Sequence, residues 1–532
     1  MKQSIPFNRP PFFQDSFTRA IKNASDAGKF SGDGINTKDC TDFLKLKYGY
    51  DRSLLTPSCT AALEMSALIL DLGPGDEVIV PSFTFVTSAN AFALRGVTIV
   101  FADCEKGSPN VSVSDILNKV TKKTKAIVVV HYAGIPVDVQ RILKETNSTI
   151  PVVEDCAHAI GSIDPKTGDF IGKSGCLSTF SFHETKNIGI GEGGLLVVND
   201  EKLWTKAQVI REKGTNRTEF QKGNVSFYTW VGLGSSYLMS DIDAAMLWSA
   251  LQHIDSIQER RLGIWDAYHR EIIPNSLFKR TKENLRANAH MYYLEFKDPI
   301  MREEFCKVMK DAGIVVAKHY VSLHTSPFAR NAATYDRQVS CPQADKWSKT
   351  LVRLPLFYDL TADKVKQVIS AVNTFATNNG TLLCPASENH WEDIRQIRNN
   401  NAKSFRNTHE IGKEEHWDFM RKHHHNYRVA TQNGKCVGFI GQVVKDIRLV
   451  TSKKGTGVSY FLADMWLEEL GDKWDVWCLR TNKRLIGFAR RYGFFPVKKI
   501  WEAGDNPIKL ERPSEEGTEL MDVLGSSLRS KL

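Results

Sequence analysis

Short apolar runs recur between residues 50 and 200, and stretches with helical spacing separate them. Several runs are almost continuously apolar, which is typical of strands buried on both faces of a sheet. The segment TAALEMSALILDLG (60–73) has helical spacing and closes on Gly73. Alternating strands and helices predict a parallel α/β sheet. The predicted strands are DEVIV (76–80), TIVFAD (98–103), AIVVVHY (126–132), PVVEDCA (151–157), LSTFSF (177–182) and GLLVVND (194–200).

The pattern changes after residue 200. Residues 200–260 have helical spacing, and a helix, two strands and a last helix near 362–377 follow. The two strands are HMYYLEF (290–296) and IVVAKHY (314–320). We therefore predict a large domain over 1–260, a smaller α+β domain over 261–377, and a polar, turn-rich linker over 378–382.

Beyond the linker the chain begins a new pattern. Amphipathic helices precede a hairpin around NGK (433–435) and a strand, DIRLV (446–450). A glycine-bearing loop then enters an amphipathic helix, SKKGTGVSYFLADMWLEEL (452–470). This order predicts a further α/β domain over 383–513, followed by a polar tail over 514–532.

Composition narrows the class of protein. The chain has 532 residues, of which 42% are hydrophobic and 25% charged, and its formal net charge is +9. The basic residues are spread out and form no nucleic-acid motif, so we expect a soluble protein that does not bind nucleic acid. The ten cysteines stand singly without a CxxC pair, so we predict no metal site and free thiols in a reducing cytoplasm. No apolar stretch approaches the roughly 18 residues of a membrane-spanning helix, and no signal-peptide core is visible.

Polar side chains stand where two predicted strands end. Asp155 ends PVVED (151–155), the first part of the run at 151–157, and Lys186 follows the run at 177–182. The carboxyl ends of strands are where parallel sheets bind ligands. A desolvated lysine amine is a nucleophile for carbonyls, and pyridoxal phosphate (PLP) uses such a lysine together with a carboxylate at its ring nitrogen. Lys186 and Asp155 are therefore the candidate catalytic pair.

Two further segments suit the same cofactor. TPSCTAAL (56–63) opens a helix with small and hydroxyl residues, and helix N-termini bind phosphate. PSFTFVTSANA (81–91) offers Phe85 as an aromatic face for the ring. Each feature alone has a common structural interpretation, such as a surface lysine, a helix cap or a core phenylalanine. Their combination favours a cofactor site.

Residues 1–377 resemble the PLP-dependent sugar-nucleotide aminotransferases of the dTDP-4-amino-4,6-dideoxygalactose transaminase type. The resemblance implies the aspartate aminotransferase fold, PLP fold type I. It rests on residues 54–92, VEDCAHA (153–159), FSFHETKN (180–187), GEGG (191–194), IREKGTNR (210–217), SSYLMSD (235–241) and VRLPLFY (352–358).

The resemblance implies a role for each matching residue. Lys186 would bond to the cofactor and then shuttle protons, and Asp155 would pair with the pyridine nitrogen. Phe85 would stack on the ring, and His158 would approach the ring hydroxyl where relatives more often have glutamine. The phosphate would be held by Cys59, Thr60 and Ser181.

One departure concerns the partner subunit. Many relatives have an asparagine that reaches the phosphate of the neighbouring subunit of a homodimer, and Ser236 stands at that position. The same family implies glutamate as amino donor. Because sugar dehydratases of this fold replace the lysine by histidine, Lys186 favours transamination. Candidate contacts to the nucleotide-sugar substrate are His183, Lys213, Asn216 and Arg217.

The C-terminal part resembles the GNAT-family N-acetyltransferases in VWCLRTNKRLIGFARRYGFFPV (476–497) and EEHWDFM (414–420). In that family the loop after the fourth strand binds the pyrophosphate of acetyl-CoA, and an asparagine after the fifth strand touches the pantetheine. The sequence departs from that family at two positions: Ser452 begins the loop where Gln or Arg is usual, and Ala489 stands at the usual tyrosine position. Without that tyrosine the general acid is unassigned, and the general base is unassigned too. The implied CoA-binding residues are Lys454, Gly455, Thr456, Gly457, Val458 and Asn482.

An aminotransferase makes a primary amine, and a GNAT domain acylates one. The combination favours a bifunctional enzyme that converts dTDP-4-keto-6-deoxyglucose to the 4-amino sugar and then to dTDP-4-acetamido-4,6-dideoxygalactose for surface polysaccharide. Amination at C3 is an alternative. Another is a C-terminal domain that only binds CoA or has a structural role. A PLP-binding regulator is a third alternative, although no helix-turn-helix is visible in the sequence.

Overall fold

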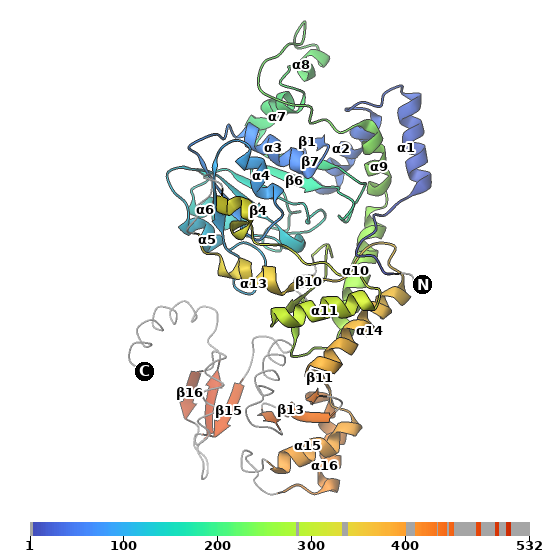
Figure 1. Cartoon of the computed structure of the whole chain (residues 1–532), viewed down its shortest axis with the longest axis vertical. Coiled ribbons are helices and arrows are strands. Elements are labelled where there is room, and N and C mark those ends of the chain that lie inside the picture. The colour runs from blue at the N-terminus through green and yellow to red at the C-terminus, as the bar shows by residue number, and fades with distance from the viewer. Residues whose placement is uncertain are drawn as a thin grey trace. The chain divides into compact units, whose positions relative to one another are not determined.

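The computed structural model describes residues 4–282, 287–331, 339–400, 410–432, 435–443, 446–451, 475–479, 495–499 and 507–511. The chain folds into two compact units (Figure 1). The first unit holds Met1–Glu271 and Arg280–Ala371, and the second holds Ile272–Lys279 and Val372–Leu532. Among the helices of the described residues, none has the length and apolarity needed to cross a bilayer.

A seven-stranded sheet forms the centre of the first unit, with the strand order β1-β7-β6-β5-β4-β2-β3. The six predicted strands are confirmed, and β1 is an additional one. Neighbours from β3 to β6 run parallel, as predicted. The strands are β1 (Ser53–Thr56), β2 (Glu77–Pro81), β3 (Thr98–Ala102), β4 (Thr124–Val130), β5 (Val152–Asp155), β6 (Leu177–Ser181) and β7 (Gly194–Val198).

The prediction of an all-parallel sheet is wrong at one edge. β7 pairs antiparallel with β6, and β1 pairs antiparallel with β7. The connection from β6 to β7 consists of turns and contains no crossover helix, whereas a parallel pair needs a long crossover connection. The turns between β6 and β7 contain Lys186, so the antiparallel return is part of what positions it.

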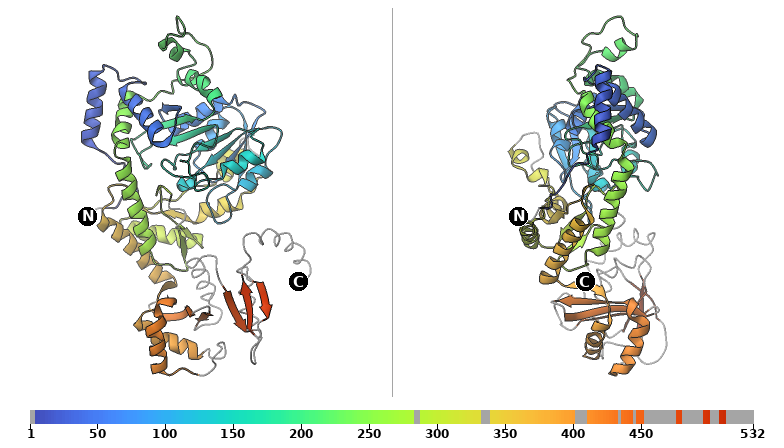
Figure 2. Two further views of the ribbon diagram at one scale, coloured as in Figure 1. Left: turned by 180° about the vertical axis from the view of Figure 1, so that it is seen from behind. Right: turned by 90° about the vertical axis from the view of Figure 1, so that its right-hand side faces the viewer.

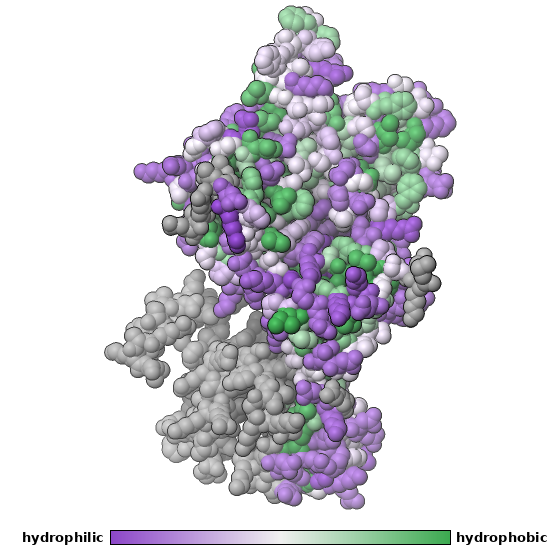
Figure 3. All heavy atoms as spheres, in the orientation of Figure 1, coloured by the Kyte–Doolittle hydropathy of each residue, from purple (hydrophilic) through white to green (hydrophobic). Residues whose placement is uncertain are grey.

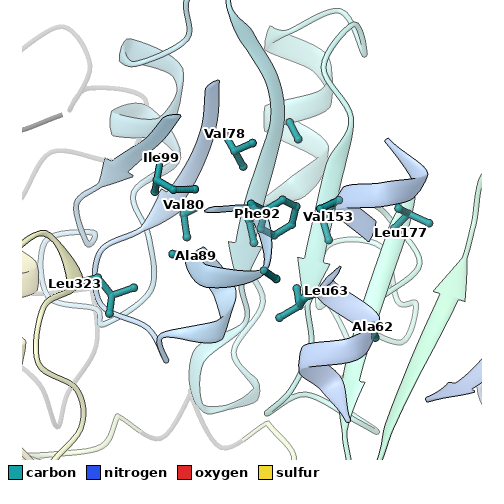
Figure 4. Close-up of a cluster of buried hydrophobic side chains, with 14 of the residues drawn as sticks. Ala62, Leu63, Val78, Val80, Ala89, Phe92, Ile99, Val153, Leu177 and Leu323 are labelled. Carbon is teal, nitrogen blue, oxygen red and sulfur yellow. The ribbon is translucent and has the colours of Figure 1, made fainter. Parts of the chain in front are cut away.

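Helices cover both faces of this sheet. Side chains of α3 (Cys59–Ile69) and α4 (Thr87–Ala93) lie against Val78, Val80 and Val153 in one apolar cluster (Figure 4). The intervening Ile79 belongs to a cluster with α5 (Val113–Asn118) and α6 (Val139–Glu145) on the opposite face. A further cluster there joins Leu195 of β7 to α2 (Ile35–Tyr48) and α9 (Asp241–Leu251). The left view of Figure 2, which shows the molecule from behind, has α1 (Gln14–Asp26) beside α9.

The remainder of the first unit follows the long helix α10 (Ile254–Glu271). The predicted strand at 290–296 is confirmed over β9 (Tyr293–Phe296), which pairs antiparallel with β10 (Leu351–Arg353). The strand predicted at 314–320 is wrong, because Ile314 and Ala317 form only isolated bridges, with Ile5 and Arg353. Its two pairing partners lie on different segments, so no ladder develops. The helices after α10 are α11 (Pro299–Asp311), α12 (Pro327–Asn331) and α13 (Pro342–Thr350). Two further helices, α7 (Trp204–Arg211) and α8 (Arg217–Gln221), lie earlier in the chain, between β7 and α9.

The longer segment of the second unit begins within α14 (Ala362–Asn379), so the predicted linker starts inside a helix and ends at β11 (Leu382–Pro385). Helices α15 (Glu388–Asn400) and α16 (Lys413–His423) follow. Trp391 of α15 and Met420 of α16 pack in the apolar core of the second unit. An antiparallel sheet joins β11 to β12 (Tyr427–Gln432), β13 (Lys435–Val443) and β14 (Asp446–Thr451), which confirms the predicted hairpin and the strand at 446–450. A second sheet has the order β15-β17-β16, with β15 (Asp475–Leu479), β16 (Phe495–Lys499) and β17 (Pro507–Glu511).

Candidate active site

The carboxyl ends of β5 and β6 bring the two predicted catalytic residues into electrostatic contact. Asp155 is the last residue of β5 and is buried. Lys186 lies in the turn after β6, where its amide N–H donates to the carbonyl of His183 at 2.9 Å. Asp155 opposes the lowering of the Lys186 pKa, as a nearby carboxylate must.

The environment of Lys186 favours a neutral amine. Burial is the main cause that lowers its pKa to about 8, and the charge of Arg353 contributes in the same direction. Cys59 and Asp155 act in the opposite direction. An amine with this pKa is partly unprotonated at neutral pH, which is the form that attacks a carbonyl carbon.

Asp155 is held in place by two donors. Ser88 Oγ, from α4, donates to Oδ2 at 2.7 Å, and the amide of Ala157 donates to Oδ1 at 3.1 Å. Ser88 Oγ also lies 2.9 Å from Thr84 Oγ1. Burial raises the pKa of Asp155, whereas these hydrogen bonds and Lys186 lower it. The carboxylate is therefore oriented before any ligand arrives.

The imidazole of His158 is neutral and has a defined tautomer. The amide of Ala133 donates to Nδ1 at 3.3 Å, which places the ring proton on Nε2, 3.4 Å from the Tyr320 hydroxyl. Burial, together with the charges of Lys186 and Arg353, lowers the pKa of His158 well below its usual value. Nε2–H is thus a hydrogen-bond donor on the side of Tyr320.

A buried amide network joins His158 to the turn of Lys186. The rings of His158 and His290 stack with centroids 4.3 Å apart, and His290 Nδ1 lies 2.8 Å from Asn187 Oδ1. Asn187 Nδ2 donates to the carbonyl of Asn288 at 2.9 Å, and Asn288 Nδ2 donates to the carbonyl of His158 at 2.9 Å. The residue after Lys186 is therefore fixed to the same network as His158.

The predicted phosphate site has the backbone geometry that an anion needs. Ser58 caps α3, accepting from the amide of Ala61 at 3.1 Å, and Cys59 and Thr60 begin the helix. A Cβ on Gly194 would lie 2.3 Å from the carbonyl carbon of Ser58 and 2.4 Å from the nitrogen of Cys59. The start of β7 thus passes directly against the helix N-terminus, which only glycine permits. Unsatisfied N–H groups and the helix dipole both favour an anion there.

The predicted aromatic face is also exposed. Phe85 keeps 54% of its surface accessible although it lies between β2 and α4, and its ring centroid is 6.1 Å from that of Tyr320. Ser181, the last residue of β6, is buried, and its Oγ accepts from the amide of His183 at 3.3 Å. An apolar face, a carboxylate, a lysine and a helix N-terminus together fit PLP.

The substrate residues predicted from 210–217 lie in a different place. A hollow of about 240 Å³ is lined by Lys213, Arg217 and Ser236 together with Lys29, Asp33 and Glu212. Arg217 Nη1 donates to Glu212 Oε1 at 2.7 Å. Asn216 does not line this hollow, and its Oδ1 accepts from the amide of Thr229 at 2.7 Å.

His183 contributes to the shape of the Lys186 turn. Its Nδ1 lies 2.9 Å from Thr185 Oγ1, and its Nε2 lies 3.8 Å from Glu192 Oε1. The predicted CoA-binding residues, Lys454, Gly455, Thr456, Gly457, Val458 and Asn482, lie outside the described residues.

A buried cluster behind β5 has a structural explanation. His131 Nε2 lies 2.9 Å from Glu154 Oε2, and Cys156 is nearby. His131 Nδ1 accepts from the amide of Val137 at 3.0 Å, and Glu154 Oε1 accepts from the amide of Ser174 at 2.9 Å. The protein itself therefore occupies the lone pairs that a metal ion would need.

Sequence reasoning missed four residues of this site: Ser88, His290, Tyr320 and Arg353. Ser88 and Arg353 stand in PSFTFVTSANA and VRLPLFY, two segments with a visible signal. The sequence pattern places Tyr320 in a strand that does not form, and His290 in a strand that begins three residues later. Their roles depend on long-range packing, which local spacing does not reveal.

Comparison with known proteins agrees with this geometry. The sequence model for the DegT/DnrJ/EryC1/StrS aminotransferase family matches residues 13–373. The chain is 31% identical to an uncharacterised protein, MJ1066, of Methanocaldococcus jannaschii over 331 residues, 60% of this chain and 85% of the relative.

Two solved structures are similar to this chain over most of its length. The putative sugar aminotransferase Spr1654 from Streptococcus pneumoniae matches with a TM-score of 0.64 and 26% identity, and its PLP-form with 0.63. The aminotransferase TlmJ from Streptoalloteichus hindustanus matches with 0.62 and 25%. Each covers 70% of this chain and 98% of the other protein.

Proposed function

The chain belongs to the DegT/DnrJ/EryC1/StrS aminotransferase family, and from this membership we propose that its first unit is a PLP-dependent sugar aminotransferase. The observation that carries the proposal is the pairing of Lys186, whose pKa burial lowers to about 8, with the buried carboxylate of Asp155. A structural lysine in a turn has no need of this environment. The solved PLP-form of Spr1654 supports the choice of cofactor.

The residues of the site divide the work of transamination. PLP, when bound, supplies an electron sink for charge that develops on the substrate carbon. Asp155 keeps a ring nitrogen protonated, because an ionised carboxylate favours the charged form of its partner. Lys186, whose amine is about half unprotonated near pH 8, takes a proton from carbon and returns it. His158 would donate its Nε2–H to the ring hydroxyl oxygen of the cofactor. Because the pKa of His158 lies well below its usual value, the imidazole stays uncharged while it does so.

We further propose that the acceptor is dTDP-4-keto-6-deoxyglucose, aminated at C4, with glutamate as donor. This finer assignment rests on the sequence resemblance. The hollow lined by Lys29, Lys213 and Arg217 offers cationic side chains for a diphosphate. It lies on segments other than those that carry Lys186 and Asp155, and we propose that in a homodimer it faces the site of a second copy of the chain.

A homodimer is part of the same proposal. The segment after α8 exposes large apolar side chains, among them Phe227 at 66%, Trp230 at 76% and Leu233 at 66%. Hydrophobic spheres appear among polar ones at the tip that holds α8 (Figure 3). Exposed aromatic residues of this size are enriched in protein interfaces.

For the second unit we propose acetylation of the new amine by acetyl-CoA. The described residues support the order of elements that the GNAT resemblance requires. Among the described residues after α14, β14 is the fourth strand, and the glycine-bearing sequence that starts at Ser452 follows it directly; β15 precedes Asn482. An acyltransferase that follows an aminotransferase would act on the amine that the first unit makes.

The test uses the purified full-length chain with PLP, glutamate and dTDP-4-keto-6-deoxyglucose, with and without acetyl-CoA, and mass spectrometry of the products. An amino sugar that gains an acetyl mass only with acetyl-CoA supports both steps. An amino sugar without acetylation contradicts the second step and leaves the first standing.

Lys186→Ala provides the matched control. This variant should lose amination while it still acetylates amino sugar that is supplied to it. Amination by Lys186→Ala would contradict the assignment of the site. A 3-keto-6-deoxy sugar nucleotide, offered in parallel, separates amination at C3 from amination at C4.

A further inference from the structure

The first described residues of the chain are anchored on the smaller part of the first unit. Ile5 is buried, and its amide donates to the carbonyl of Gly313 at 2.8 Å. The ring centroid of Phe7 lies 4.9 Å from the guanidinium carbon of Arg353, the last residue of β10. These two contacts fix the backbone directly before the next residue, Asn8.

Asn8 connects this segment to the turn that carries Lys186. Its Nδ2 donates to the backbone carbonyl of Glu184 at 2.7 Å. Glu184 and Thr185 are the two central residues of that turn, because the amide of Lys186 donates to the carbonyl of His183 at 2.9 Å. Asn8 thus binds the peptide group in the middle of the turn, two residues before the lysine.

The other end of the same peptide group is also held. The amide of Thr185 donates to Nδ1 of His183 at 3.3 Å, so this nitrogen is an acceptor and Nε2 carries the ring proton. Nε2 faces the carboxylate of Glu192, 3.8 Å from Oε1, as a donor would. His183 therefore binds the N–H of this peptide group, and Asn8 binds its oxygen.

The orientation of this peptide group decides the type of the turn. Neither Glu184 nor Thr185 has a positive φ, which fits a type I turn. Rotating the peptide group by half a turn gives a type II turn, which needs a positive φ at Thr185. A β-branched residue disfavours that φ without forbidding it. In the alternative turn the carbonyl would point away from Asn8, and the backbone torsions directly before Lys186 would change.

The carbonyl of Glu184 depends on Asn8 for its hydrogen bond. Among the backbone hydrogen bonds of the described residues, none ends on this oxygen. Gly189 packs against it so closely that a Cβ there would lie 2.5 Å from the oxygen. No other donor fits on that side, so the side-chain amide of Asn8 is the group that satisfies it.

We propose that Asn8 is a positioning residue for Lys186, acting through the central peptide group of the turn. This inference rests on the proposed aminotransferase function, in which Lys186 takes and returns a proton. Because the hydrogen bond holds one orientation of the peptide group, it keeps the lysine backbone in the conformation that delivers the amine. Asn8 itself touches neither the substrate nor the reacting atoms.

The first experiment measures kcat and KM of the full-length holoenzyme for the wild type, Asn8→Ala, Asn8→Gln and Asn379→Ala. Asn8→Ala should lower kcat about 2- to 10-fold, the range of one ordinary hydrogen bond, and leave the KM for glutamate unchanged. Asn8→Gln keeps an amide donor and should recover part of the loss. Asn379 is the matched control, because its Nδ2 also donates to one backbone carbonyl, that of Phe375 at 2.9 Å within α14. An unchanged kcat in Asn8→Ala overturns the inference.

A spectroscopic experiment separates positioning from contact with a substrate. Lys186 transfers the proton in both halves of the reaction, so Asn8→Ala should slow the change of cofactor absorbance with glutamate and with the amino sugar by the same factor. A loss confined to one of the two substrates would mean that Asn8 contacts that substrate, which contradicts the inference. A wild type that responds to neither substrate contradicts the proposed function instead.

The cofactor-free protein offers a readout that is independent of activity. Rotation of the peptide group separates the Thr185 amide from His183, so hydrogen exchange at this amide should become about 2- to 10-fold faster in Asn8→Ala. Fragmentation mass spectrometry resolves the single amide, and the midpoint of thermal unfolding should stay the same. Exchange at the wild-type rate would show that Asn8 does not hold this peptide group.

Thr185→Gly tests the peptide group itself. Glycine accepts a positive φ, so this variant makes the alternative turn accessible. The loss of kcat caused by Asn8→Ala should therefore be larger in the Thr185→Gly background than in the wild type. An equal or smaller loss would place the effect of Asn8 outside the turn and overturn the inference.

Discussion

The hydroxyl of Ser88 donates a 2.7 Å hydrogen bond to Oδ2 of Asp155 and so connects α4 to the end of β5. Both groups are buried, and Thr84 lies within hydrogen-bond distance of the serine hydroxyl. A buried carboxylate with this donor is more easily ionised than one without it. The bond therefore supports the charge that Asp155 presents to the site.

Replacing Ser88 by alanine should weaken that charge. We expect Ser88→Ala to lower kcat about 10-fold, the effect of one lost hydrogen bond to a charged group. Steady-state amination with mass-spectrometric detection measures it. Ser66→Ala is the control, because the Ser66 hydroxyl is also buried but donates to the carbonyl of Ala62 within α3. Equal losses in the two variants would show that general packing, not the carboxylate, is responsible.

The reactivity of Lys186 should follow its lowered pKa. In the cofactor-free protein, acylation of Lys186 should rise tenfold per pH unit below about 8 and level off above it, because only the neutral amine reacts. Peptide mass spectrometry after a brief pulse of an acylating reagent measures the profile for this one residue.

Two variants should move that midpoint in opposite directions. Arg353→Met removes a positive charge that disfavours the protonated amine, so the midpoint should rise. Asp155→Asn removes a negative charge that favours it, so the midpoint should fall. Shifts in the same direction would mean that these charges do not face the amine.

The sequence predicts the place of some residues of the candidate site but not of others. Lys186 and Asp155 follow apolar strands, and this spacing places them at the carboxyl edge of a sheet without knowledge of contacts. The antiparallel edge was not predictable in this way, because β1 is a short strand whose pairing with β7 depends on residues far along the chain. Arg353 and His290 reach the site through packing of the smaller part of the unit, which periodicity does not encode.

The close approach of β7 to α3 should make Gly194 intolerant of any side chain. A Cβ there would meet backbone atoms of Ser58 and Cys59, which cannot rotate away. Gly194→Ala should displace the helix N-terminus and lower PLP affinity about 5- to 150-fold, as expected from overpacking that costs about 1–3 kcal/mol.

Gly73→Ala is the matched control, since a Cβ at Gly73 would meet no atom within 4 Å. Equilibrium dialysis against PLP, followed by cofactor absorbance, gives both affinities. If Gly194→Ala binds PLP as tightly as Gly73→Ala does, the phosphate is not held at this junction.

The stacked imidazoles of His158 and His290 should make the first unit sensitive to acid. Burial lowers the pKa of both rings well below the usual value of 6.5, so the folded state binds fewer protons than the unfolded state once the pH falls below 6.5. The free energy of unfolding should then fall by about 1.4 kcal/mol per pH unit for each histidine, and it should be unaffected by them above pH 6.5. Hydrogen exchange of peptides from β5 and β6 between pH 7 and 5, corrected for intrinsic exchange rates, measures this slope. His158→Gln should reduce the slope of the unfolding free energy against pH by the contribution of one histidine. The double variant with His290→Gln should reduce it by the contribution of two. Equal slopes in all three proteins would mean that the imidazoles are protonated in the folded state.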